Sequence, residues 1–168
     1  MKLQKFILSP PNDYEIAAVY SKGSGDLLFC IHGLGCSHNS FRSLEGQSEL
    51  KDYSFLAVDL FGFGNSGRSD EFSYSMEDHA EICAALLQQF SYERLHLLAH
   101  SMGGAIALLL PPNILDSVES FANIEGNLIA ADCGIASRRA RQRCRSINFN
   151  PRFSLNSNSN LLNTHLSI

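Results

Sequence analysis

One serine lies where its hydroxyl could act as a nucleophile. Ser101 stands in the segment His100–Gly104, between a short apolar run and an apolar stretch with helical character. Small residues are needed at such a junction because the strand and the helix approach each other closely there. A sharp turn of this kind lifts the hydroxyl above the sheet, clear of other side chains. The pattern predicts Ser101 as a nucleophile; the alternative is that its hydroxyl only caps the helix.

A nucleophilic serine also needs donors for the negative charge that develops on the attacked carbonyl oxygen. The backbone N–H of Met102 points toward the same space and lies at a helix N-terminus, which favours negative charge. The N–H of Leu34, in the glycine-containing loop His32–Gly35, is the expected second donor. Each such donor commonly stabilises the transition state by about 3–4 kcal/mol. Together the three groups indicate acyl-transfer chemistry.

Strands and helices alternate along the chain and would position these groups. Five apolar segments predict strands, at residues 16–20, 27–31, 55–59, 95–99 and 118–124. Two amphipathic or apolar segments predict helices, Met76–Phe90 with Ser75 as its cap and Ser101–Leu110 ended by two prolines. This alternation indicates an α/β fold with a parallel sheet and helices on both of its faces. Each glycine loop follows a strand, at the edge where such sheets bind ligands.

Three motifs in register resemble the α/β-hydrolase superfamily, most closely its small esterases and C–C bond hydrolases. They are His32–Gly33, the segment Asp59–Ser66 with glycines at its fourth and sixth positions, and His100–Gly104. The resemblance covers residues 5–132. It implies a Ser–His–acid triad, an oxyanion hole at Leu34 and Met102, and hydrolysis of esters or similar acyl bonds. It also implies structural roles for His32 and His100, whereas Asp59 is expected to order its loop by hydrogen bonds.

The chain departs from the family pattern at two places. Ala99 replaces the first glycine that usually precedes the serine turn. In the family, a cap and two further strands follow the strand that ends near Ile124, and these strands carry the triad acid and histidine. The resemblance stops after Arg139, so we expect an α/β-hydrolase fold that is incomplete at its C-terminus, as in a truncated or frame-shifted product or a fragment.

The departure leaves two candidates for the remaining triad positions. His165 is the only histidine after Ser101 and therefore the only base in the usual order of serine, acid and histidine. Glu125 directly follows the strand expected beside the nucleophile strand, where some relatives place their acid. Each residue also has an interpretation without a catalytic role. His165 can be part of a tail without a regular pattern of apolar residues, and Glu125 can be a surface or helix-capping carboxylate.

Charge divides the chain near residue 132. Residues 1–132 carry 17 acidic and 7 basic residues, whereas residues 133–168 carry six arginines and no acidic residue. Five of these arginines lie between Arg138 and Arg145, without interleaved aromatic residues, and an Asn/Ser-rich stretch follows. We therefore expect a hydrolase core at 1–132 and a tail at 133–168 that is disordered or a non-native continuation. A nucleic-acid partner is not expected.

Other features narrow the class of protein. The five cysteines fit no zinc pattern, so we expect neither a metal nor a cofactor. No apolar run is long enough for a membrane helix and the N-terminus does not resemble a signal peptide, so we expect a cytoplasmic protein without membrane contact. The sequence does not indicate an oligomeric state. Two functions remain open. One is a serine hydrolase acting on a small ester-like substrate; the other is a catalytically inactive, truncated member without a complete triad, which binds a small ligand or is a non-functional fragment.

Overall fold

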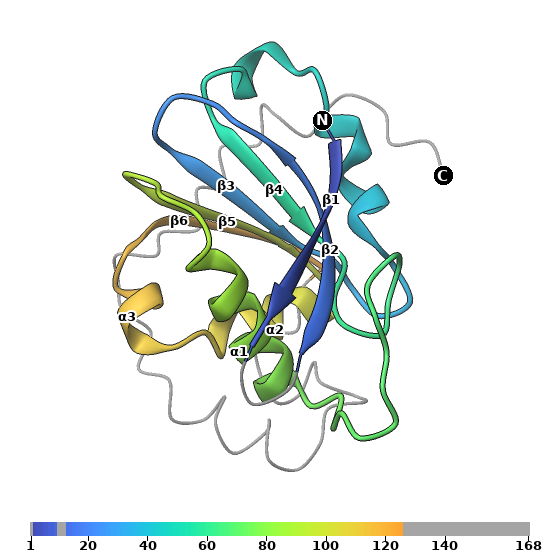
Figure 1. The fold of residues 1–168 in the computed structure, drawn as a ribbon. Helices are drawn as coiled ribbons and strands as arrows, with labels where there is room; N and C mark the ends of the chain where they lie inside the picture. The colour runs from blue at the N-terminus through green and yellow to red at the C-terminus, as the bar shows by residue number, and fades with distance from the viewer. Residues whose placement is uncertain (1, 10–12, 126–168) are drawn as a thin grey trace.

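The computed structural model describes residues 2–9 and 13–125, which form one sheet flanked by helices (Figure 1). The sheet has six strands in the order β1-β2-β4-β3-β5-β6. Their bounds are Lys2–Leu8 (β1), Tyr14–Ser21 (β2), Leu27–Ile31 (β3), Ser54–Val58 (β4), Leu95–His100 (β5) and Val118–Ile124 (β6). The five predicted strands are confirmed: two have the predicted bounds and the ends of the other three differ by at most two residues. The structure adds β1.

The sheet is parallel where the chemistry is expected and antiparallel at one side. β4, β3, β5 and β6 run parallel to one another, whereas β2 pairs antiparallel with both β1 and β4. The carboxyl ends of the parallel strands therefore meet at one edge of the sheet, and the three glycine loops meet there too. This confirms the predicted α/β fold class, with a sheet that is mostly parallel and has the antiparallel strands β1 and β2 at one side.

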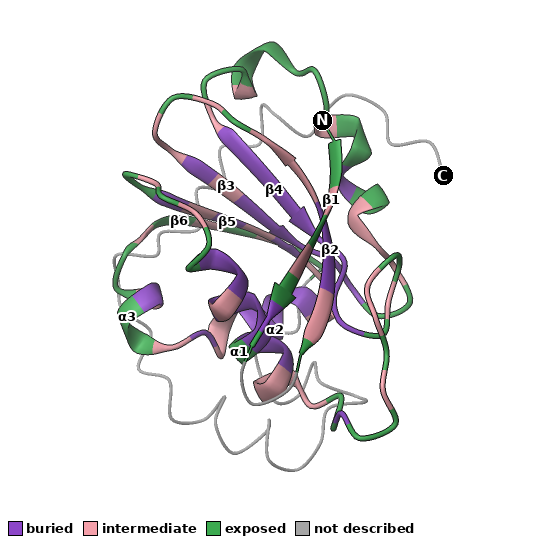
Figure 2. Cartoon of the chain, in the orientation of Figure 1, coloured by how far each residue is buried: buried purple, intermediate pink, exposed green. Residues whose placement is uncertain are grey.

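The central strands are apolar because both of their faces are covered. All five residues of β4 are buried, and in β3 only Leu28 is partly accessible (Figure 2). Alternate side chains of β3 enter two separate clusters: Phe29 and Ile31 pack in the large core, and Cys30 packs with Phe41 in a smaller one. Continuous apolar runs of this kind are typical of strands that are buried on both faces.

Helices of two kinds cover the two faces. The α-helices are α1 (Met76–Leu87), α2 (Met102–Leu108) and α3 (Pro112–Leu115), and all three contribute buried residues to the large core. The smaller cluster lies under the 3₁₀ helix η1 (His38–Leu44), which precedes a second short turn, η2 (Ser48–Leu50). Among the described residues, α-helices thus pack on one face only, which differs from the prediction of helices on both.

Helix ends differ from the predicted ones for local reasons. Ser75 caps α1 as predicted, since its Oγ accepts a hydrogen bond from the N–H of Asp78 at 3.1 Å. α1 ends at Leu87 rather than Phe90. α2 begins at Met102 rather than Ser101, because Ser101 has a non-helical backbone. None of the described helices is long and apolar enough to cross a membrane. The predicted boundary at residue 132 and the tail lie outside the described residues.

Candidate functional site

Ser101 occupies a strained turn between β5 and α2. Its backbone angles are φ 50° and ψ −119°, in a region that residues with a Cβ rarely adopt. Conformations of this kind cost about 1–3 kcal/mol and persist where the surrounding structure enforces them. The Ser101 side chain makes no capping hydrogen bond. The structure therefore contradicts the alternative in which this serine serves as an ordinary helix cap.

Two glycines allow the turn to lie close against the sheet. A Cβ added to Gly103 would stand 2.3 Å from the carbonyl oxygen of Ile31, which is far inside van der Waals contact. A Cβ added to Gly33 would stand 3.1 Å from the Cβ of Ser101 and 2.9 Å from Nδ1 of His100. The absence of side chains at these positions brings the loop after β3, the serine and the first turn of α2 together.

The two predicted oxyanion donors flank this contact. Leu34 follows Gly33 directly, and Met102 is the first residue of α2. Within residues 2–9 and 13–125, neither backbone N–H has a hydrogen-bond acceptor. The side chain of Leu34 is 58% exposed, so this loop also presents an apolar residue to solvent. Among the described residues, both amides are thus without an acceptor.

Asp59 orders the loop after β4. The carboxylate is fully buried and accepts hydrogen bonds from the N–H of His38 at 2.6 Å and from the N–H of Asn65 at 2.8 Å. It also pairs with Nδ1 of His38 at 2.8 Å. Burial alone would raise the pKa of Asp59, but the hydrogen bonds from His38 and Asn65 outweigh burial and hold it below its ordinary value. The predicted structural role of Asp59 is confirmed, and His38 is the partner that the sequence did not reveal.

His32 is also structural. Its Nε2 accepts the N–H of Leu60 at 3.0 Å, and its Nδ1 lies 2.7 Å from the carbonyl oxygen of Gly33. Both ring nitrogens are therefore occupied in the tautomer with the proton on Nδ1. Burial lowers the pKa of this histidine, which keeps the ring neutral. Because neither nitrogen is free, His32 is not available as a base for Ser101, as the resemblance implied.

Glu125 lies beside the serine turn. The N–H of Ser101 donates to the carbonyl oxygen of Ile124 at 2.9 Å, which ties the residue before Glu125 to the nucleophile candidate. Glu125 has φ 52°, a second strained backbone at the same edge of the sheet. Its side chain is exposed, and Oε2 lies 3.5 Å from Nε2 of His100. His165, the candidate base, lies outside the described residues.

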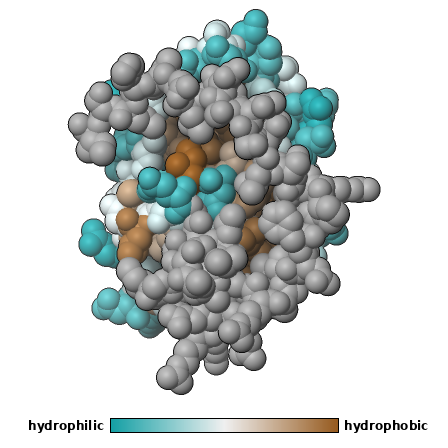
Figure 3. All heavy atoms as spheres, turned by 180° about the vertical axis from the view of Figure 1, so that it is seen from behind, coloured by the Kyte–Doolittle hydropathy of each residue, from teal (hydrophilic) through white to brown (hydrophobic). Residues whose placement is uncertain are grey.

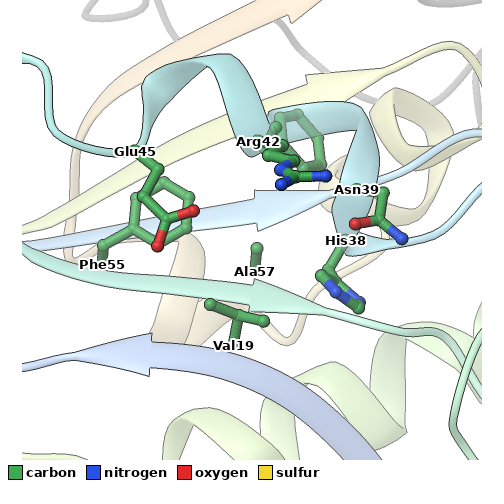
Figure 4. Close-up of a pocket in the computed structure, with 8 residues that line it drawn as sticks. Val19, His38, Asn39, Arg42, Glu45, Phe55 and Ala57 are labelled. Carbon is green, nitrogen blue, oxygen red and sulfur yellow. The ribbon is translucent and has the colours of Figure 1, made fainter. Parts of the chain in front are cut away.

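Neither of the two cavities found includes Ser101. One, of about 100 Å³, lies between η1 and the sheet, and His38 and Arg42 are on its rim (Figure 4). The other, of about 310 Å³, lies beside Tyr14 and Phe72. Within the part of the chain that the structure describes, no group of three or more His, Cys, Asp or Glu side chains could hold a metal ion. Ser101 itself is partly buried, and neither of these two cavities is lined by it.

Comparison with known proteins agrees with this geometry. A family model described as the alpha/beta hydrolase fold matches residues 26–144. Among curated proteins, the probable lysophospholipase BODYGUARD 4 of Arabidopsis thaliana is 34% identical over 110 residues, 59% of this chain and 26% of that protein. Protein phosphatase methylesterase 1 of Candida albicans is 33% identical over 103 residues, 56% of this chain and 28% of that protein.

Solved structures show the same fold. The N-acyl homoserine lactonase AidH, in complex with N-butanoyl homoserine, superposes with a TM-score of 0.68 at 24% identity, covering 77% of this chain and 47% of that one. A membrane phospholipase A described as a bacterial virulence factor gives 0.61 at 30% identity, covering 76% and 41%. The chain spans about a quarter of the first curated relatives and less than half of these structures. Because the family model matches more than half of the sequence, the chain belongs to the α/β-hydrolase fold family.

Proposed function

We propose that this protein hydrolyses ester or related acyl bonds of small molecules, with the hydroxyl of Ser101 as the nucleophile. The observation that carries the proposal is the strained, positive-φ backbone of Ser101 at the junction of β5 and α2. A serine that needed only to cap a helix would not require this conformation, whereas a nucleophile gains from being lifted out of the chain.

In the proposed reaction, Ser101 Oγ attacks the carbonyl carbon of the substrate and the carbonyl oxygen becomes an oxyanion. The N–H groups of Leu34 and Met102 are proposed to receive that charge. Both lack an acceptor among the described residues, and Met102 opens the helix whose N-terminus is partially positive. The acyl-enzyme would then be hydrolysed by water.

We further propose Glu125 as the triad acid and His165 as the base. Glu125 follows the strand next to β5, and the hydrogen bond from Ser101 to Ile124 fixes the spacing of the two strand ends. The left-handed backbone at Glu125 gives this residue the same kind of strain as Ser101. A carboxylate at this point can orient an imidazole that approaches Ser101 from outside the described core.

The names of the relatives support an acyl-bond substrate. They include lysophospholipases, a methylesterase and an esterase/lipase. Each of these names describes a protein of which this chain spans about a quarter to a third. An acyl-bond hydrolase activity is therefore proposed for this chain from its own serine turn and its family match, and the substrate is proposed only as a small ester.

The test is to react the full chain with a fluorophosphonate probe and with a 4-nitrophenyl ester. Ser101→Ala should abolish labelling at this position and lower esterase turnover by about 10³-fold or more. Ser91→Ala, at an exposed serine outside the site, should change neither. Glu125→Gln should lower turnover by roughly 10²–10⁴-fold if this carboxylate orients the base. Turnover that is unchanged in Ser101→Ala would refute the proposal.

A second candidate function is ligand binding without turnover. It is favoured by one observation: within residues 2–9 and 13–125, no imidazole is hydrogen-bonded to the Ser101 hydroxyl. A serine without a base has little nucleophilicity near neutral pH. This function would be supported if Ser101 resisted the probe while a short-chain ester bound saturably, measured by calorimetry.

A further inference from the structure

A second serine lies beside a histidine and a carboxylate at the opposite end of β5. Oγ of Ser120 on β6 lies 2.7 Å from Nδ1 of His96 on β5. Nε2 of the same imidazole lies 3.7 Å from Oδ2 of Asp26, which immediately precedes β3. Ser120 is exposed, whereas the side chains of His96 and Asp26 are 14% and 15% exposed. A hydroxyl, an imidazole and a carboxylate therefore follow one another across three neighbouring strands.

An irregularity in the sheet produces this alignment. Leu95 pairs with Val118, but the next residue, His96, pairs with Ser120, so Glu119 is an extra residue on β6. Without the irregularity, His96 would face Glu119 and the serine would point to the other side of the sheet. Bulges of this type re-aim side chains and are frequent beside active sites. The bulge thus places the hydroxyl directly opposite the imidazole.

Neighbouring groups fix the imidazole in the orientation that a general base needs. The ring of Tyr53 meets the His96 ring edge-on, with the centroids 5.3 Å apart. Nε2 is buried and has no hydrogen-bond partner among the described residues. In the tautomer with its proton on Nε2, Nδ1 accepts the Ser120 hydroxyl and the N–H faces the Asp26 carboxylate. This is the arrangement in which an imidazole can take a proton from a serine.

Asp26 is held as a carboxylate. Arg94 donates to it twice, from Nε to Oδ1 at 3.0 Å and from one terminal nitrogen to Oδ2 at 2.6 Å. The hydrogen bond from Arg94 lowers the pKa of Asp26, so the group stays charged at neutral pH. Oδ2 of Asp26 is therefore held in a position to stabilise the imidazolium that forms when His96 accepts a proton.

We propose that Ser120 is a second nucleophile of this protein, activated by His96, and that it takes acyl groups from activated esters. The inference is independent of the function proposed for Ser101. His96 and Ser101 are five residues apart along β5, about 16 Å at strand geometry. The two sites therefore lie at opposite edges of the same sheet and share no residue.

The proposed step is a simple acyl transfer. Ser120 Oγ forms a bond to the carbonyl carbon of an aryl ester while His96 Nδ1 takes the hydroxyl proton, and the bond to the aryl oxygen breaks. The aryloxide leaves, and the proton passes from the imidazolium to it through solvent. The products are an acyl-Ser120 ester and a phenol. The site is expected to act on esters with good leaving groups, because an aryloxide leaves without protonation at the site.

The experiment uses the full chain with Ser101→Ala, treated with 4-nitrophenyl acetate and followed by peptide mass spectrometry. Acetylation of Ser120 should be about 10²-fold faster than that of the exposed serines Ser43 and Ser91 in the same molecule, the gain expected from a general base. This comparison is internal and requires no further variant to fold.

Two variants separate activation from simple exposure. His96→Phe keeps a ring against Tyr53 but removes the base, so acetylation of Ser120 should fall to the rate of Ser91. Asp26→Asn should cause a smaller fall. Equal acetylation of Ser120, Ser43 and Ser91 in the parent protein would overturn the proposal. An unchanged Ser120 rate in a His96→Phe protein with native circular dichroism would overturn it as well.

Discussion

Strained backbone conformations occur at a few isolated residues in the described part of the chain. Among the described residues, Tyr74, Ser101 and Glu125 are the residues other than glycine with positive φ. Ser101 and Glu125 end two neighbouring strands and are linked through the hydrogen bond from Ser101 to Ile124. Strain of this kind is kept only where packing enforces it, and it is frequent at functional sites. At the residue scale, the edge that contains these two positions is the part of the fold with the clearest mark of function.

Because the imidazole of His79 is buried, we expect the free energy of unfolding to depend on pH. It is buried on α1 among aromatic rings, including those of Phe72 and Phe63, and burial lowers its pKa to about 4. Between pH 6.5 and about 4 the unfolded chain binds a proton here and the folded chain does not, so stability falls as the pH falls through this window. The expected loss is up to roughly 3 kcal/mol, measured by urea denaturation at several pH values.

His79→Phe is the matched variant, because it keeps an aromatic ring in the cluster and cannot take a proton. Its stability should depend less steeply on pH between 6.5 and 4. Some dependence should remain, because burial also lowers the pKa of His32. A His79→Phe protein with the full slope of the parent would show that this histidine is not the group responsible.

Asp59 predicts a second loss of stability in more acidic solution. Its pKa is lowered in the folded chain, so its contribution is complete above the unfolded value of about 4 and is lost as the pH falls through the folded value. Asp59→Asn should destabilise the fold by about 3 kcal/mol at pH 7, because buried donors from His38 and Asn65 lose a charged acceptor. Thermal unfolding measures the effect. The exposed Asp70→Asn is the control and should change stability little.

At the scale of elements, the sequence predicts most of what is local. Apolar runs predicted β3 and β4, which are buried on both faces, and β5, in which every second residue is buried; Ser75 marked the start of α1. The pairing of His38 with Asp59 was not predictable, because 21 residues separate the two and their contact depends on two loops. The alignment of Ser120 with His96 was also not predictable, since it depends on a β-bulge that the residue types do not indicate.

Two glycine substitutions can separate the cost of steric overlap from the cost of a positive φ. The first lies at the junction of β5 and α2. Gly103→Ala would place a Cβ 2.3 Å from the carbonyl oxygen of Ile31 and should destabilise the fold by about 3 kcal/mol or more. Gly103→Val should be worse. Gly46→Ala is the control: its Cβ would meet nothing within 4 Å, and only its positive φ of 81° would cost about 1–2 kcal/mol.

The expected difference between the two glycines is measurable by chemical denaturation. If Gly103→Ala and Gly46→Ala cost the same, the close approach of α2 to β3 would not be what requires glycine at position 103. A larger cost for Gly103→Ala would confirm that the serine turn depends on this contact.

At the scale of the whole molecule, the described sheet has an open side. β6 pairs only with β5 among residues 2–9 and 13–125, and Ala122 and Ile124 on it are exposed. Seen from behind, the described residues present apolar atoms beside hydrophilic ones (Figure 3). Open strand edges of this kind promote association between molecules.

A charge on β6 should therefore reduce self-association. Ala122→Lys places an ammonium group on an exposed position of the strand and should lower light scattering at high concentration, with little change in melting temperature. Ser43→Lys, outside the sheet, controls for the change in net charge. Equal scattering by the two variants would mean that β6 is not the surface through which molecules associate.

The order of strands in the sheet also determines when each strand gains its neighbours during synthesis of the protein. β3 lies between β4 and β5, and both of these partners come later in the sequence. At ribosomal rates of about 5–20 residues per second, β5 begins to emerge roughly 3–13 s after β3 is complete. During this interval one long edge of the most apolar strand has no neighbour. The nascent chain therefore passes through a period in which the apolar strand Leu27–Ile31 has an unpaired edge, and slower translation over residues 32–94 would lengthen it.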